Sequence, residues 1–196
     1  MTPKKEKPSL ILASASPRRL ELLARIGIVP DCVETAEVDE TQKKRELPAD
    51  LVLRLAELKA RDVAGRNPGA LVLGADTVVA CGRRILPKAG DEAEARRFLE
   101  LLSGRRHRVY GGVSVVDAKG KAHSRLVVTA VAFKRLEAQE IDAYVAGGEW
   151  RGKAGAYAIQ GRAGAFVRKI NGSYSNVVGL SLFETVSLLK GLGYQV

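Results

Sequence analysis

The stretch that most constrains the fold is residues 9–28, SLILASASPRRLELLARIGI. Residues 9–12 form a short apolar run bounded by small residues, which is typical of a buried strand. Ser16 suits a helix N-cap and Pro17 the first helical position. The apolar residues that follow recur at helical spacing: Leu20, Leu22, Leu23 and Ile26. The stretch therefore predicts a strand, a tight turn and a helix that ends near Arg25.

The turn of this unit, residues 13–19, is made of small, hydroxyl and basic residues. A helix start carries free backbone N–H groups and a partial positive charge, and Arg18 and Arg19 add fixed charge. This arrangement is suited to binding an anion such as phosphate. The alternative is an ordinary capped helix whose arginines face water.

Residues 47–64 predict a long helix that starts near Pro48 and Asp50. Its expected apolar face is marked by Leu51, Leu55, Leu58 and Val63. Lys59 lies towards this face, where lysine is unusual. The sequence leaves two interpretations open, a lysine that extends its amine to water and a lysine that contacts a phosphate.

Residues 70–80, ALVLGADTVVA, form the clearest buried strand of the chain. An aspartate inside such a strand costs free energy unless it is paired or bound to a metal, so Asp76 is a candidate functional residue. Gly74 and Ala75 leave space for a close approach beside it. The preceding acidic turn, residues 37–41, contains Glu40. It is either a solvated loop, the commoner case, or a source of Mg²⁺ or Mn²⁺ ligands.

The remaining pattern alternates strands and helices. Residues 28–38 and 166–170 are expected to contain strands, and residues 109–116 and 124–133 an antiparallel hairpin. Helices are expected at 91–102, 137–146 and 182–192. The basic run 105–108 is the best candidate for nucleic-acid contact, although so short a run is usually a solvated turn. Residues 153–161 predict a loop that either lines a site or lies on the surface.

Composition narrows the function. The net charge of +10 indicates an anionic partner, either nucleic acid or a phosphorylated small molecule. No apolar run reaches the ~20 residues that span a bilayer, and no export signal is visible, so we expect a cytoplasmic protein. Cys32 and Cys81, the two cysteines, are expected in the core. Neither a Walker A motif nor G-x-G-x-x-G is present, which argues against a P-loop enzyme and a dinucleotide-binding protein.

Several ordered motifs resemble the Maf family of nucleoside triphosphate pyrophosphatases, which are related in fold to the inosine triphosphatases. They are LASASPRR (12–19), VDE (38–40), GADTVV (74–79), LSG (102–104) with His107, KAGAYAIQG (153–161) and INGSYSNVVGL (170–180). The resemblance implies an α/β fold with a long, twisted mixed sheet flanked by helices, and two lobes with a central cleft. We therefore predict one domain over residues 9–196, preceded by a flexible tail over residues 1–8.

The resemblance also implies the chemistry, a metal-dependent cleavage of a nucleoside triphosphate to the monophosphate and pyrophosphate. Asp76 matches the catalytic aspartate, expected to activate water or bind the metal, and Glu40 the metal-associated glutamate; the metal would be Mg²⁺ or Mn²⁺. The triphosphate-binding positions fall on Ser14, Arg18, Arg19, Lys59 and Lys88, of which Lys59 and Lys88 are also assigned to catalysis. The positions at which the family sets base preference match Arg18, Thr77 and Gln160.

A glutamine in AYAIQG resembles the branch that prefers dTTP and UTP. A side-chain amide can pair with the carbonyl and N3–H of these bases. A homodimer and a role in clearing nucleotide pools are family expectations, while membrane and nucleic acid are not expected partners. Two alternatives remain: a nucleic-acid-binding regulator of septum formation and cell division without catalysis, and a pyrophosphatase for 7-methyl-GTP or other non-standard nucleotides.

Overall fold

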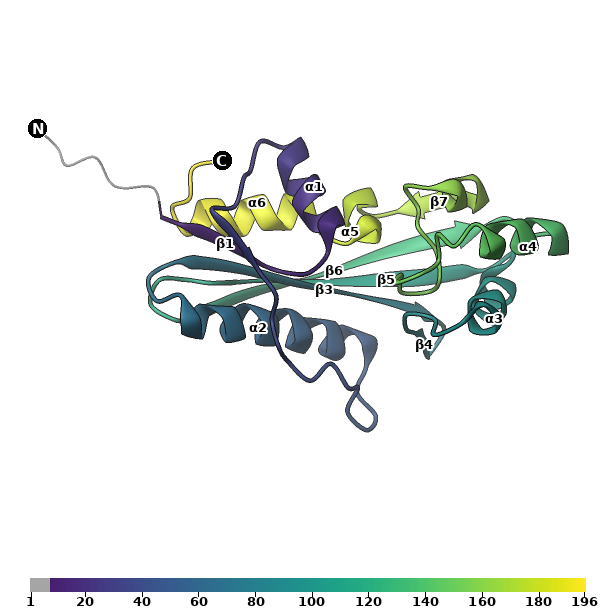
Figure 1. Ribbon diagram of the computed structural model, residues 1–196, viewed down its shortest axis with the longest axis horizontal. Coiled ribbons are helices and arrows are strands. Elements are labelled where there is room, and N and C mark those ends of the chain that lie inside the picture. Colours follow the sequence, from purple (N-terminus) through teal and green to yellow (C-terminus); the bar gives the residue numbers. More distant parts are fainter. Residues whose placement is uncertain (1–7) are drawn as a thin grey trace, which may run out of the picture.

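The computed structural model describes residues 8–196 (Figure 1). Residues 1–7 of the predicted tail lie outside the described residues. The strands are β1 (Leu10–Ala13), β2 (Cys32–Glu34), β3 (Leu71–Cys81), β4 (Arg84–Leu86), β5 (Arg106–Val116), β6 (Ala122–Phe133) and β7 (Val167–Asn171). The helices are α1 (Pro17–Arg25), α2 (Pro48–Arg66), α3 (Glu92–Leu102), α4 (Ala138–Ala146), the 3₁₀ helix η1 (Arg162–Phe166), α5 (Tyr174–Val178) and α6 (Leu182–Gly191).

All seven strands form one mixed sheet in the order β2-β1-β3-β5-β6-β7, with β4 beside β3. β1 is parallel to β2 and β3, whereas β5, β6 and β7 continue in antiparallel register. Helix α2 covers one face of the sheet, α1, α5 and α6 lie on the other, and α3 and α4 lie at the far end (Figure 1). The predicted α/β class and mixed sheet are confirmed.

One edge of β3 is divided between two partners. Its first half, residues 71–74, pairs with β1, and its last residues, 79–81, pair with β4. Within the described residues, no strand pairs with residues 75–78 on this edge, while β5 occupies the opposite edge from Val72 to Ala80. The sheet therefore opens at the middle of β3, and ligands in α/β proteins bind at such points of divergence.

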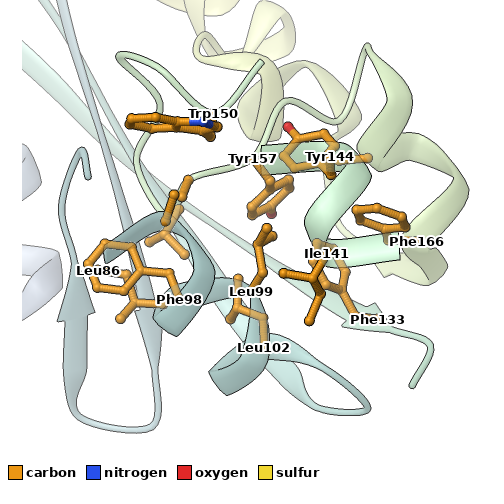
Figure 2. Packing of buried hydrophobic residues seen from close by; sticks show 14 of the residues in the cluster. Leu86, Phe98, Leu99, Leu102, Phe133, Ile141, Tyr144, Trp150, Tyr157 and Phe166 are labelled. Atoms are coloured by element: carbon orange, nitrogen blue, oxygen red, sulfur yellow. The ribbon is translucent and has the colours of Figure 1, made fainter. Parts of the chain in front are cut away.

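The core is divided in the same way. Around β1, alternating residues face opposite layers: Leu10 and Leu12 pack with α1 and α6, whereas Ile11 and Ala13 pack against α2. The other end of the sheet has its own aromatic-rich cluster, which joins α3, α4 and the segment around Trp150 (Figure 2). These clusters correspond to the two predicted lobes.

Helix α2 lies unusually close to the sheet because two strand residues opposite it are glycines. A Cβ on Gly74 would lie 2.4 Å from the carbonyl oxygen of Ala56, and one on Gly112 would lie 2.3 Å from that of Val52. Any other residue at these positions would push the helix away. Gly74 was expected to allow a close approach beside Asp76, and the helix backbone makes that approach.

Some local expectations were wrong. Leu58 is 37% exposed, and Lys59 takes the buried position beside it, because the side of α2 that meets the sheet is rotated from the predicted stripe. Cys32, expected in the core, is exposed, since β2 is the edge strand; β2 lies within the expected range 28–38 but is only three residues long. The run 105–108 is not a turn: β5 begins at Arg106. Helices η1 and α5 were not predicted, because both are single turns without an apolar period.

His107 is 1% exposed and lies between aromatic rings at the start of β5. Its ring meets Phe133 edge to face at 5.0 Å, and its Nε2 lies 2.9 Å from the hydroxyl of Tyr157. Burial lowers the pKa of His107 from 6.5 to about 4, because the charged imidazolium is poorly solvated there.

Among residues 8–196, no helix combines the length and apolar character needed to cross a membrane.

We predict that Gly112→Ala lowers the free energy of unfolding by about 3 kcal/mol, because the new methyl group meets the α2 backbone, which cannot rotate away. Denaturant titration measures this. The matched control is Gly65→Ala on α2 itself, where an added Cβ meets nothing within 4 Å. That variant should gain up to about 1 kcal/mol from helix propensity. Equal stability of the two variants would contradict the close packing.

We also predict an acid-sensitive contribution from His107. The unfolded chain binds a proton near pH 6.5 and the folded chain only near pH 4, so folding is favoured above pH 6.5 and this advantage is lost as pH falls to 4. The contribution is on the order of 3 kcal/mol. His107→Gln, which does not titrate, should lose less stability than the wild type between these pH values in denaturant titrations. An equal loss of stability in the variant and the wild type would refute the lowered pKa of His107.

Candidate active site

A cavity of about 290 Å³ lies where β3 opens between β1 and β4. Its floor is the centre of β3, one wall is the turn from β1 into α1, and the opposite wall is the loop before η1. All nine predicted site residues line it: Ser14, Arg18, Arg19, Glu40, Lys59, Asp76, Thr77, Lys88 and Gln160. The structure thus brings together residues spread over almost 150 positions of the chain, although their individual roles stay predictions.

Lys59 lies between the two carboxylates of the site. Its Nζ donates a hydrogen bond to Asp76 Oδ1 at 2.7 Å and lies 2.8 Å from Glu40 Oε1. Lys59 and Asp76 are both buried, whereas the Glu40 side chain is half exposed. The buried aspartate is therefore paired, as its position in an apolar strand requires.

The close contact of α2 with Gly74 determines where this lysine lies. Lys59 immediately precedes Ala60 on α2, and the backbone N of Ala60 would lie 2.7 Å from a Cβ on Gly74. Asp76 lies two residues after Gly74 on β3. The helix thus carries the ammonium group to the open segment of β3. Of the two interpretations of Lys59, extension into bulk water is wrong.

The local cations determine the charge of Glu40. Partial burial opposes ionisation, but the hydrogen bond from Lys59 and the charges of Lys59, Lys88 and Arg19 outweigh it and lower the pKa of Glu40. The carboxylate is therefore charged at neutral pH. Asp76 and Glu40 together offer hard oxygen donors around the ammonium group of Lys59.

Arg19 is a buried arginine that joins three segments of the cavity. It donates to Ser14 Oγ at 3.0 Å, to the carbonyl oxygen of Gly179 at 2.9 Å and to Thr77 Oγ1 at 3.4 Å. Burial lowers its pKa, and the charge of Asp76 opposes that shift. The idea that both arginines face water is therefore wrong for Arg19. Its hydrogen bonds hold the first turn of α1 against β3.

Arg18 lies half-buried on the rim at the N-terminal end of α1. Ser16 is the N-cap, as predicted, but its side chain makes no capping hydrogen bond. Instead, Ser14 Oγ accepts from Ser16 N at 3.2 Å. Burial lowers the pKa of Arg18. The helix start and its arginine line the cavity, and anion binding there stays a prediction.

The opposite wall joins Lys88 to the loop that carries Gln160. Lys88 pairs with Ala154 in an isolated antiparallel bridge, and Gly155 N donates to the carbonyl oxygen of Leu86 at 2.9 Å. Gln160 is exposed at the end of this loop. Of the two interpretations of residues 153–161, the one that lines a site is confirmed.

The lining residues that the sequence did not assign to the site include Lys153, Tyr157 and residues 177–179. Lys153 lines it, and burial together with the charge of Arg18 lowers its pKa. Its position in a loop with Gln160 was the available signal. Tyr157 and residues 177–179 also line the wall. Their apolar character is the same as that of core residues, so composition could not distinguish them.

The donor set fits a hard divalent cation. Mg²⁺ is commonly held by one or two carboxylates, with waters and substrate phosphates completing its shell. Asp76 and Glu40 supply two such carboxylates around Lys59. Among residues 8–196, no group of three or more histidine, cysteine or acidic side chains could hold a metal ion. Water and substrate phosphates would have to supply the remaining ligands.

Comparison with known proteins agrees with the motifs. A family model described as "Maf-like protein" matches residues 9–192. A dTTP/UTP pyrophosphatase of Paramagnetospirillum magneticum is 64% identical over 94% of this chain and 97% of that protein. A dTTP/UTP pyrophosphatase of Rhodospirillum rubrum is 61% identical over 95% and 89%.

Among solved structures, a HAM1 protein from Coxiella burnetii aligns with 66% of this chain and 74% of its own, at 16% identity and a TM-score of 0.48. That score is too low to add to the assignment. The family match covers nearly the whole chain, and the relatives match over nearly their full length. The chain therefore belongs to the Maf-like protein family.

Proposed function

We propose that this protein hydrolyses the α–β phosphate bond of dTTP and UTP, releasing the nucleoside monophosphate and pyrophosphate. The observation that carries the proposal is a cavity lined by five basic side chains, one of which, Lys59, joins the two carboxylates. A triphosphate is the small anion whose charge such a cavity matches. The names of relatives more than 60% identical support the same reaction.

Each side chain has a task in this reaction. Arg18, Arg19 and Lys88 would bind phosphate oxygens and neutralise the charge that builds up on them in the transition state. Asp76 would accept a proton from the attacking water or orient it, and Lys59 would hold that carboxylate in place. Asp76 and Glu40 would hold Mg²⁺ or Mn²⁺, which supplies further charge neutralisation at the phosphates.

The base would lie against the loop wall of the cavity. The amide of Gln160 can accept from N3–H and donate to the O4 carbonyl of thymine or uracil. Thr77 and Arg18, which line the same cavity, would contribute to base preference with Gln160. We infer that the protein removes these nucleotides, and modified pyrimidine forms, from cytoplasmic pools as a homodimer.

We predict that Asp76→Asn lowers kcat for dTTP by about 10² to 10⁴-fold, because it removes the proton acceptor. Pyrophosphate release measures the rate, and circular dichroism with thermal unfolding checks the fold. The matched control is Asp142→Asn, an exposed carboxylate on α4 that pairs with Arg96. That variant should keep wild-type turnover. A folded Asp76→Asn protein with wild-type kcat would refute the assigned role.

We further predict that pyrophosphate release requires Mg²⁺ or Mn²⁺ and stops in EDTA, because the two carboxylates need the ion to engage the phosphates. A panel of dTTP, UTP, CTP, their 5-methyl forms and 7-methyl-GTP defines the substrate. Release that favours another base would support the pyrophosphatase reaction and reject the role of Gln160 in base preference. No release from any nucleotide, combined with salt-sensitive binding of duplex DNA, would favour the nucleic-acid-binding regulator.

A further inference from the structure

The loop that carries Gln160 is fixed on both sides by residues from α4 and the turn that follows it. Ala158 N donates to the hydroxyl oxygen of Tyr144 at 3.0 Å, and Arg162 N donates to Glu149 Oε2 at 2.9 Å. Ala158 and Arg162 lie two residues before and two residues after Gln160. The backbone of Gln160 is therefore held at both ends of a five-residue segment.

The contact to Tyr144 is buried, whereas the contact to Glu149 lies at the surface. Tyr144 is 1% exposed, and Figure 2 shows its ring in the aromatic cluster beside Phe166, which it meets at 5.4 Å. Because the side chain of Tyr144 is buried, its hydroxyl is an acceptor that water does not readily replace for the Ala158 amide. On the other side, a Cβ on Gly161 would lie 2.1 Å from Glu149 Oε2, so only glycine lets this carboxylate reach the backbone.

A third contact ties the same two segments together. The guanidinium of Arg162 donates through its NH1 to the carbonyl oxygen of Ala143, in the last turn of α4, at 3.2 Å. Tyr144 and Glu149 do not line the cavity, unlike Gln160. Tyr144 can influence a bound nucleotide only through the loop, whereas the charge of Glu149 also acts on Lys153 at the cavity.

Base selection by an amide depends on such support. A glutamine amide carries an acceptor and a donor side by side, so one orientation matches uracil or thymine and the reversed orientation matches cytosine. A Gln160 on a mobile backbone could meet either pattern. Because the terminal side-chain torsion exchanges the two orientations, a fixed backbone acts by holding the amide at one distance and in one plane relative to the base, so that a base that cannot pair there leaves the amide without a partner.

We propose that Tyr144 and Glu149 are positioning residues that set the preference for uracil and thymine over cytosine by fixing the backbone around Gln160. This inference rests on the proposed pyrophosphatase function. Loss of either contact should allow the loop to shift and lower the ratio of kcat/KM for UTP to that for CTP. A single lost hydrogen bond corresponds to a change of about tenfold.

The experiment measures kcat and KM for UTP and CTP in Tyr144→Phe, Glu149→Ala and Glu149→Gln. We expect the UTP/CTP ratio to fall about tenfold in the first two, mainly through KM for UTP. Glu149→Gln keeps an oxygen acceptor for Arg162 N and should retain the ratio. The matched control is Tyr110→Phe, a half-buried tyrosine on β5 that does not line the cavity.

The same substitutions in a Gln160→Ala background test whether they act through this residue. There, Tyr144→Phe should cause no further fall in the ratio. An equal fall in kcat for both nucleotides with an unchanged ratio would show a general structural role and overturn the proposal. So would a further fall of the same size without Gln160.

Amide hydrogen exchange separates this inference from the proposed function. Tyr144→Phe should speed exchange at Ala158, and Glu149→Ala at Arg162, whether or not the protein hydrolyses a nucleotide. Faster exchange in a protein that hydrolyses no triphosphate would reject the function and support the positioning of the loop. Unchanged exchange in both variants would overturn the positioning itself.

Discussion

The structure depends on the contact between α2 and two glycines of the sheet. Gly74 on β3 and Gly112 on β5 let the helix backbone approach to a distance that no Cβ allows. This contact places Lys59 beside Asp76 at 2.7 Å, with Glu40 on its other side. A charged aspartate in an apolar strand is stable only with such a partner. The same close packing of α2 on the sheet therefore determines both the position of the helix and the position of the charged groups in the site.

The second constraint is the divided edge of β3. Because β1 pairs with its first half and β4 with its last residues, the middle of the strand exposes Asp76 and Thr77 to the cavity. The apolar clusters follow the same division, with one around β1, α1 and α6 and another around α3 and α4. The two lobes thus contribute different walls: the first brings the arginines, and the second brings Lys88 and the loop with Gln160.

The cations of the cavity differ in burial, and those that are buried have hydrogen-bond partners that offset the cost of their lost solvation. Arg19 is satisfied by oxygens of Ser14, Thr77 and Gly179, which makes it a rigid donor. Arg18 and Lys153 lie nearer the rim, and their pKa values are lowered by burial. An anionic substrate would relieve this excess of positive charge. Charge that is already oriented needs little reorganisation when a phosphate binds.

The sequence alone determined the strand–turn–helix of residues 9–28, the buried strand around Asp76, the β5–β6 hairpin and the family, because these follow from local periodicity and ordered motifs. Only the tertiary structure decided that Lys59 is buried while Leu58 is exposed, since the rotation of α2 follows from glycines on two strands distant in sequence. Only it decided that His107 is a core residue and that Tyr144 and Glu149 hold the loop around Gln160. Such contacts join segments that are distant in sequence, and the local pattern of one segment does not depend on the other, so periodicity could not reveal them.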